Sequence, residues 1–183
     1  METVKDGIVT AVKGGGDVFQ ATVNTTSQAL TTTLKDAGKV AGSATEAITD
    51  TASGAIHGAA GVGAHLGHAS KGIVVGVLRG TKHVGSEAID TIGHTAGVVI
   101  DNTAAVGGKL EHAATGLVEG AIHSAKELGV SAEDAASAAA DGALKAAGKV
   151  GTAAVETVRN AVTKTADGAK VILHHAKAAV TNK

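Results

Sequence analysis

Apolar residues recur along this chain at a step of eleven residues, and the step keeps one phase across most of the sequence. Every eleventh residue from Ala55 is apolar: Ala55, Leu66, Val77, Ala88, Val99, Leu110, Ala121, Ala132, Ala143 and Ala154. The same step from Glu46 to Asp167 meets only polar or ionisable residues. Eleven residues fill three α-helical turns at about 3.67 residues per turn. The pattern therefore predicts an amphipathic helix with a broad apolar face.

The unbroken phase predicts an all-α fold made of one very long, nearly continuous helix. A helical hairpin would normally need a loop that resets the phase, and no reset is visible. Proline, which would force a kink, is absent from the 183 residues. At 1.5 Å per residue the helix would be roughly 275 Å long. Its eleven-residue period suits packing in a slightly right-handed coiled coil, a bundle or a filament.

The apolar face is the expected binding surface, and we call it the apolar stripe. Its larger members are Val18, Val40, Ile56, Val62, Leu66, Ile73, Val77, Val84, Ile89, Val99, Val106, Leu110, Leu117, Ile122 and Leu128. A few valines, among them Val75 and Val98, fall on the polar side of the pattern. Glycines four residues apart would let a second helix approach closely. We expect such contacts at Gly72, Gly76, Gly80, Gly116 and Gly120.

The repeat is the only organisation visible, so residues 1–183 are expected to form a single helical region. Three glycine-containing places could act as hinges, namely residues 14–16, 107–108 and 128–131. Ser131 followed by Glu133 and Asp134 is typical of a helix start. The continuous phase nevertheless favours soft turns within one helix at all three places.

The composition argues against an ordinary globular core. The chain has one Phe, no Trp, Tyr, Pro or Cys, and 26 Gly. Large aromatic anchors, which usually dominate core energetics, are therefore missing. Each glycine also costs a helix about 1 kcal/mol relative to alanine. The isolated helix should be weak in water, so we expect a lipid surface or close helix packing to stabilise it.

Charge and hydropathy exclude several classes of partner. Lys and Arg number 16 and Asp and Glu 17, which gives no basic surface for nucleic acid and disfavours binding driven by anionic lipid charge alone. No apolar run is long enough to span a membrane, and the first residues lack the features of a signal peptide. We therefore expect a protein that is intracellular or peripheral to a membrane.

Histidine is the only ionisable residue type in unusual supply, with nine copies. His65 and His68 lie three residues apart and are weak candidates for chelating a metal. The simpler interpretation is that the histidines line the solvated face, where we expect a response near pH 6 more than metal binding. Phosphate-binding, dinucleotide-binding and nucleophile motifs are not found. We expect a protein that is not an enzyme and has no cofactor.

Two stretches, Gly148 to Val158 and Lys164 to Lys170, resemble the eleven-residue repeats of perilipins and synucleins, and more distantly those of group 3 late-embryogenesis proteins. The resemblance implies a chain that becomes helical on lipid droplets or vesicles. Our first hypothesis is therefore a lipid-surface protein that binds through its apolar stripe. The alternative is a self-assembling structural protein, a homo-oligomer in which the same stripe packs against copies of itself.

Overall fold

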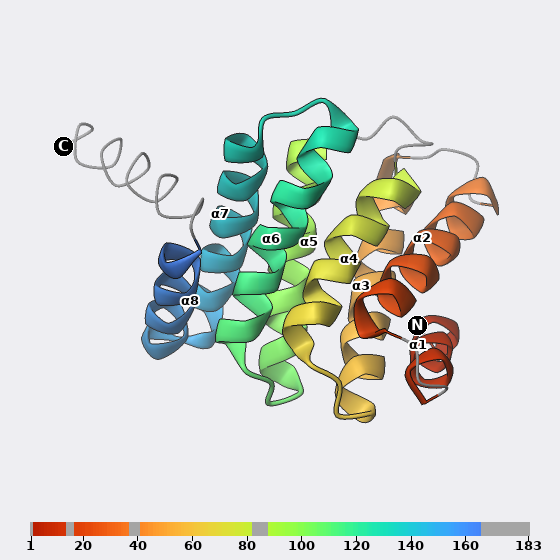
Figure 1. The fold of residues 1–183 in the computed structure, drawn as a ribbon, viewed down its shortest axis with the longest axis horizontal. Coiled ribbons are helices and arrows are strands. Elements are labelled where there is room, and N and C mark those ends of the chain that lie inside the picture. The colour runs from red at the N-terminus through yellow and green to blue at the C-terminus, as the bar shows by residue number, and fades with distance from the viewer. Residues whose placement is uncertain (1, 14–16, 37–40, 82–87, 166–183) are drawn as a thin grey trace.

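The computed structural model describes residues 2–13, 17–36, 41–81 and 88–165. These residues form eight helices (Figure 1), which are α1 (Glu2–Lys13), α2 (Val18–Asp36), α3 (Ala41–Gly61), α4 (Leu66–Thr81), α5 (Ala88–Ala105), α6 (Leu110–Leu128), α7 (Ala132–Val150) and α8 (Thr152–Lys164). The described part is thus all-α. The prediction of one nearly continuous helix is wrong, because the helices reverse direction and pack against one another.

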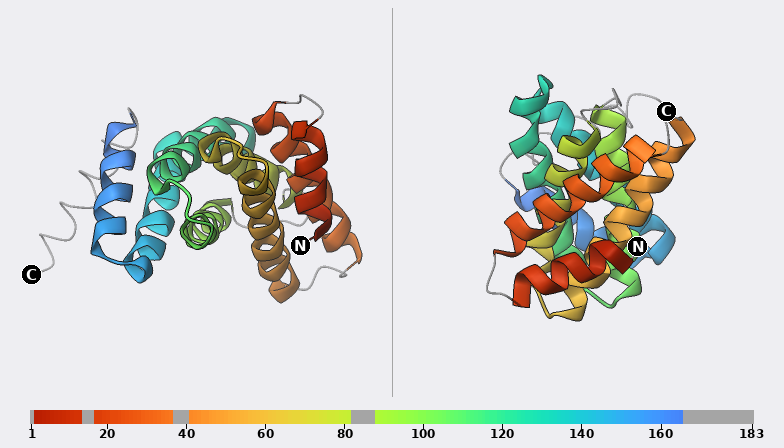
Figure 2. Two further views of the ribbon diagram at one scale, coloured as in Figure 1. Left: turned by 90° about the horizontal axis from the view of Figure 1, so that it is seen from below. Right: turned by 90° about the vertical axis from the view of Figure 1, so that its right-hand side faces the viewer.

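The helices form two layers. α2, α4, α6 and α8 lie side by side in one layer, and α1, α3, α5 and α7 lie in the other (Figure 1). The most extensive contacts are made within layers, between α2 and α4, α4 and α6, and α5 and α7. Stacked helical hairpins of this kind are the architecture of α-solenoids. Figure 2 shows that the helices follow a curve, with α1 and α8 at opposite ends.

The lengths of helices and turns explain why the eleven-residue phase survives the reversals. Leu66, Ala88, Leu110 and Ala132 begin four successive helices. Each of these residues follows the previous one by two full repeats of the pattern, so each helix starts at the same position of the repeat. A reversal of the chain therefore does not shift the eleven-residue pattern. For this reason the pattern was compatible both with one continuous helix and with an array of packed helices.

Glycine in a left-handed conformation ends the helices at three turns. Gly63, Gly107 and Gly129 have φ angles of 66°, 68° and 68°, a region that residues with a Cβ atom enter only at a cost. Beyond Gly107, the amide of Gly108 donates to the Thr103 carbonyl at 2.8 Å, which closes a Schellman motif.

Two of the three expected hinge regions are therefore turns between separate helices. Residues 107–108 lie between α5 and α6, and residues 129–131 lie between α6 and α7. Soft turns within one helix, which the phase favoured, are not found at these two places. Residues 14–16, the third region, lie outside the described residues. The start of α7 is capped by Ser131, whose Oγ accepts a hydrogen bond from the Asp134 amide at 2.9 Å.

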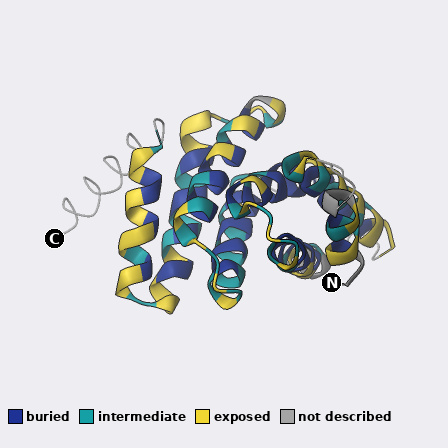
Figure 3. Ribbon diagram, turned by 60° about the horizontal axis from the view of Figure 1, so that its bottom comes forward, coloured by how far each residue is buried: buried dark blue, intermediate teal, exposed yellow. Residues whose placement is uncertain are grey.

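Small side chains build most of the core. α7 buries only alanines, which are Ala135, Ala136, Ala139, Ala140, Ala143, Ala146 and Ala147. Larger buried residues come from α1 to α6, for example Leu30 of α2, Ile56 of α3, Ile73 of α4, Ile100 of α5 and Leu117 of α6. Figure 3 shows that buried residues occupy the faces that the helices turn toward one another, while much of α8 is exposed.

α4 is buried almost all round because it contacts helices of both layers. Its neighbours are α2, α3, α5 and α6. Val75, which the pattern placed on the polar side, is therefore fully buried. The position of a residue in the repeat determines whether its side chain is exposed only in helices that have one face in solvent. Little of the surface of α4 faces solvent.

Candidate functional site

The apolar stripe lies inside the array. Ile56, Ile73, Val77, Val99 and Leu117 are fully buried. The half-buried members are Val18, Val62, Leu66, Ile89, Val106, Leu110, Ile122 and Leu128. Val40 and Val84 lie outside the described residues. In this arrangement the stripe contacts neighbouring helices, so contact with lipid or with another copy requires the helices to separate.

Glycine allows α4 to approach α2 closely. Gly72, Gly76 and Gly80 lie one turn apart on the face of α4 that meets α2. A Cβ atom added at Gly76 would lie 2.7 Å from the Cβ of Thr26, and one at Gly80 would lie 2.9 Å from the Cβ of Leu30. Both distances are shorter than van der Waals contact, so a side chain at either position would push the two helices apart.

The next interface of the same layer, between α4 and α6, is closer still. A Cβ atom at Gly116 would overlap the backbone carbonyl of Gly67, and one at Gly120 would lie 2.8 Å from the carbonyl oxygen of Lys71. The other layer repeats this feature, since a Cβ atom at Gly142 of α7 would overlap the carbonyl of Gly93 of α5. Backbone therefore meets backbone, as in contacts between small residues of other closely packed helices.

Ion pairs cross the same interfaces, and three of them join residues 48 positions apart. They are Lys71–Glu119 at 3.3 Å, Arg79–Glu127 at 2.9 Å and Lys149–Asp101 at 3.2 Å. Their side chains are 31 to 72% exposed, and exposed pairs contribute at most about 1 kcal/mol each. Their common spacing shows that neighbouring helices of a layer run parallel in one register, but the pairs add little stability.

Three histidines meet where the turn before α4 approaches the start of α6. The ring of His65 lies 4.9 Å from that of His68 and 4.6 Å from that of His112, measured between centroids, and its plane is within 19° of the His112 plane. Partial burial of its ring lowers the pKa of His65, and the nearby positive charges of His112, His68 and Lys109 lower it further. We call His65, His68 and His112 the histidine trio.

The trio includes the two histidines proposed as a weak metal pair, together with one that sequence reasoning missed. On a continuous rod, His112 would lie far from His68, but the fold places α6 beside α4. Their separation of four full repeats places His68 and His112 at the same position of the pattern, but it does not show that their helices adjoin. Among the described residues, no group of three His, Cys, Asp or Glu side chains is arranged to hold a metal ion.

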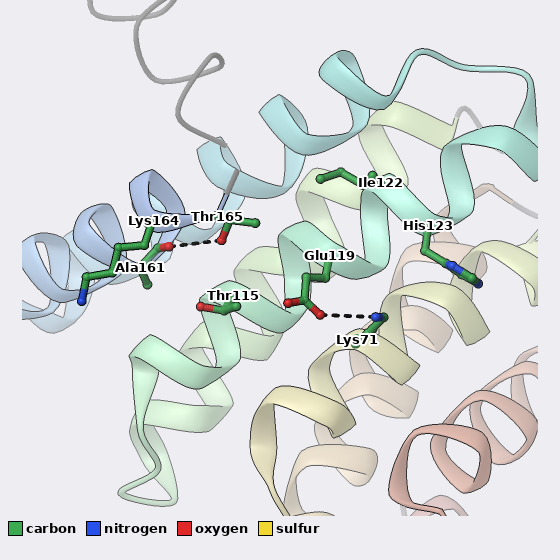
Figure 4. A pocket seen from close by; sticks show the side chains of 8 residues that line it. All are labelled: Lys71, Thr115, Glu119, Ile122, His123, Ala161, Lys164 and Thr165. Atoms are coloured by element: carbon green, nitrogen blue, oxygen red, sulfur yellow. Dashed lines mark hydrogen bonds and ion pairs between the residues drawn. The ribbon is translucent and has the colours of Figure 1, made fainter. Parts of the chain in front are cut away.

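A groove of about 540 Å³ lies between α4, α6 and α8, and Figure 4 shows the side chains that line it. Among the charged side chains that line it, Lys71 pairs with Glu119, and Lys164 pairs with Glu111 at 3.4 Å. The Thr165 hydroxyl donates to the carbonyl of Ala161 at 3.2 Å. The two ion pairs thus link α6 to α4 and to α8.

The Thr-rich groove at the other end has similar properties. It also measures about 540 Å³ and lies between α1, α2 and α3, where its lining includes Thr25, Thr32, Thr33, Thr51 and Asp50. Neither groove collects a set of groups that would recognise one ligand. The candidate functional features are therefore the buried stripe, the glycine turns and the histidine trio.

Within the described helices, none is long and apolar enough to cross a membrane. No protein-family model matches the chain, and a search of curated proteins gives no significant match.

Proposed function

We propose that the protein binds lipid surfaces reversibly, by opening its helical array so that the apolar stripe lies on a droplet or membrane. The observation that carries the proposal is the interval of two full repeats between the starts of α4, α5, α6 and α7. A hairpin array needs only turns of suitable shape, whatever their phase. Here each helix from α4 to α6, together with the turn that follows it, spans two repeats. A turn that becomes helical therefore joins the stripes of its two helices in line.

The packing favours easy opening. The core is made largely of alanine, valine and glycine contacts, which bury less apolar area per residue than large side chains. Among the described side chains, four buried hydroxyl groups have no hydrogen-bond partner, namely those of Thr26, Ser70, Thr103 and Ser124. A buried unpaired polar group costs about 1–3 kcal/mol. Opening would return these groups to water and would remove that cost.

The charge balance indicates what kind of surface is bound. With a net charge of −1, the chain gains little from anionic headgroups. Shallow contacts of Val, Ala, Thr and Ile with the interface, repeated along the helix, would supply the affinity. We therefore propose binding that depends on exposed acyl chains, as at droplets or loosely packed membranes, more than on lipid charge.

Distance measurements between Arg79 and Glu127 test the proposal directly. Their side chains are in contact across α4 and α6, whereas on one continuous helix they would lie about 72 Å apart at 1.5 Å per residue. The chain has no cysteine, so spin labels at R79C and E127C are unambiguous. We expect the short distance in buffer and a long one on neutral droplets or vesicles. An unchanged short distance on bound protein would refute opening.

A label pair within one helix is the matched control. Glu133 and Lys145 are both exposed on α7 and should stay about 18 Å apart in either state. Sedimentation of the same samples distinguishes the self-assembly hypothesis. If the 79–127 distance lengthens without lipid and the protein sediments as an oligomer, the stripe packs against other copies and the lipid proposal fails.

A further inference from the structure

The histidine trio lies beside the closest backbone contact between α4 and α6. Gly67, which follows His65 by two residues, presents its carbonyl to Gly116 of α6. A Cβ atom at Gly67 would lie 3.0 Å from the ring carbon Cε1 of His65 and 3.0 Å from the carbonyl oxygen of His112. The trio and the glycine contact thus occupy the same junction, so repulsion between the three rings would act where the two helices meet.

Uncharged imidazole rings can stack in this way, whereas charged ones repel. The stacked pair joins His65 to His112, one from each side of the junction, and His68 flanks it from the first turn of α4. We propose that the histidine trio is a pH-sensitive latch, which holds α4 against α6 when neutral and releases them when protonated.

The charges around the histidine trio favour release of the two helices when the rings are protonated. Lys109, in the turn before α6, adds a further positive charge that acts on His65. The acidic groups on neighbouring elements are engaged elsewhere: Glu111 with Lys164 of α8, Glu119 with Lys71 of α4, and Asp17, before α2, with the amide of Phe19. On α3, Nδ1 of His57 is hydrogen-bonded to the carbonyl of Ser53 at 2.8 Å. Protonated rings at the junction would therefore face mainly positive charge.

The direction of the pH effect follows from linkage. The pKa of His65 is lowered below its ordinary value of 6.5 in the closed array. When the helices separate, the pKa returns toward 6.5, so the open state takes up protons first as the pH falls. The stability that depends on a neutral His65 is therefore complete above about pH 6.5 and is lost as the pH falls toward the lower value of the closed array.

One consequence of the latch rests on the proposed function, namely that mild acidity promotes lipid binding. The loosening of α4 from α6 is a property of the folded protein alone. It can therefore be measured without lipid, and the two ideas can fail separately.

Thermal unfolding in lipid-free buffer at about pH 7.5 and about pH 5.5 tests the latch. We expect the Tm of the unmodified protein to fall by at least about 2 °C between these values. The variant H65Q/H68Q/H112Q should lose most of this fall, because glutamine cannot be protonated. The H123Q variant, which removes an exposed histidine of α6 outside the trio, should keep the full fall.

The pH dependence of Tm is the readout, so a uniform change in Tm does not count for or against the latch. If the triple variant does not fold, H65Q alone replaces it, since His65 lies in the turn before α4, with only part of its ring covered, and its loss should be tolerated. An equal fall of Tm in the trio variant and in the unmodified protein would overturn the latch. Flotation with neutral vesicles at both pH values then tests the consequence. Absence of binding at both values would refute the lipid proposal and leave the latch standing.

Discussion

Gly107 and Gly129 occupy equivalent positions of the repeat and have the same left-handed backbone conformation, with φ at 68° in both. The first ends α5 and the second ends α6, and two full repeats of the sequence pattern separate them. In the closed array each is a turn residue. On the continuous helix proposed for the lipid-bound chain, each would be an ordinary interior position, so under that proposal these two glycines favour the closed array.

Alanine at both positions should therefore shift the balance toward the open form. In the closed array, the left-handed conformation would cost each alanine about 1–2 kcal/mol. On the continuous helix, each would gain about 1 kcal/mol relative to glycine. We expect G107A/G129A to lower Tm in buffer and to raise the fraction that floats with neutral vesicles. Circular dichroism and flotation on the same preparation measure both effects.

Gly148 provides the control for this experiment. It lies on α7, a Cβ atom there would meet nothing within 4 Å, and its position is helical in either arrangement. We expect G148A to raise Tm by about 2–4 °C per kcal/mol gained and to leave lipid binding unchanged. If G107A/G129A raised Tm in the same way, the two turns would carry no conformational strain and would not control opening.

Insertions in the turn between α5 and α6 test the phase itself. Two residues inserted between Gly108 and Lys109, beyond the Schellman motif, should leave the folded array almost unchanged, because surface turns tolerate lengthening. On a continuous helix they would rotate the two halves of the stripe by about 200° relative to each other, whereas four residues would leave them within about 40° of alignment. We expect the two-residue insertion to weaken vesicle binding much more than the four-residue insertion.

Equal binding by the two insertion variants would show that the halves of the stripe bind lipid independently. The Tm of both variants in buffer is the control, because it reports on the closed array and should be similar for the two. A large loss of Tm in the two-residue variant alone would mean that the turn tolerates only particular lengths.

The contact between Gly116 and Gly67 gives a separate prediction for the closed array. The added Cβ atom of G116A would overlap the Gly67 carbonyl, and a misfit of this kind typically costs about 1–3 kcal/mol. Improved helix propensity offsets no more than about 1 kcal/mol. We expect a lower Tm by thermal unfolding, in contrast to the rise in G148A. A rise in G116A would mean that the backbones of α4 and α6 are not in contact at this glycine.

Helix type could be predicted from the sequence, and two of the turns lie at places named as possible hinges, but the sequence did not show that the chain reverses direction there. The difficulty lies in the turn glycines. Gly107 is one of 26 glycines, most of the described ones lie within helices, and its turn has no proline to distinguish it. The phase, which usually reveals a hairpin, is kept because helix and turn together span two full repeats. Ser131 and the acidic residues after it were the clearest local signal of a boundary, and α7 does begin there.

The histidine trio illustrates the same limit for the site. His65 and His68 could be paired from sequence because they are one helical turn apart. His112 could be added only by knowing that α4 and α6 are parallel neighbours, which depends on a long-range contact between Gly67 and Gly116 that no local pattern reports. The burial of Val75 was missed for a similar reason, because it depends on how many helices surround α4.

The titration of His65, followed by NMR of its ring protons, should have a midpoint below 6.5. Burial is the largest cause of the lowered pKa, and the charge of His112 is the next. The H112Q variant removes that charge and leaves part of the burial, so the midpoint should rise but should stay below 6.5. The K109Q variant should raise it by less, since Lys109 is the smallest of the causes. A midpoint at or above 6.5 in the unmodified protein would mean that the three rings do not meet in solution.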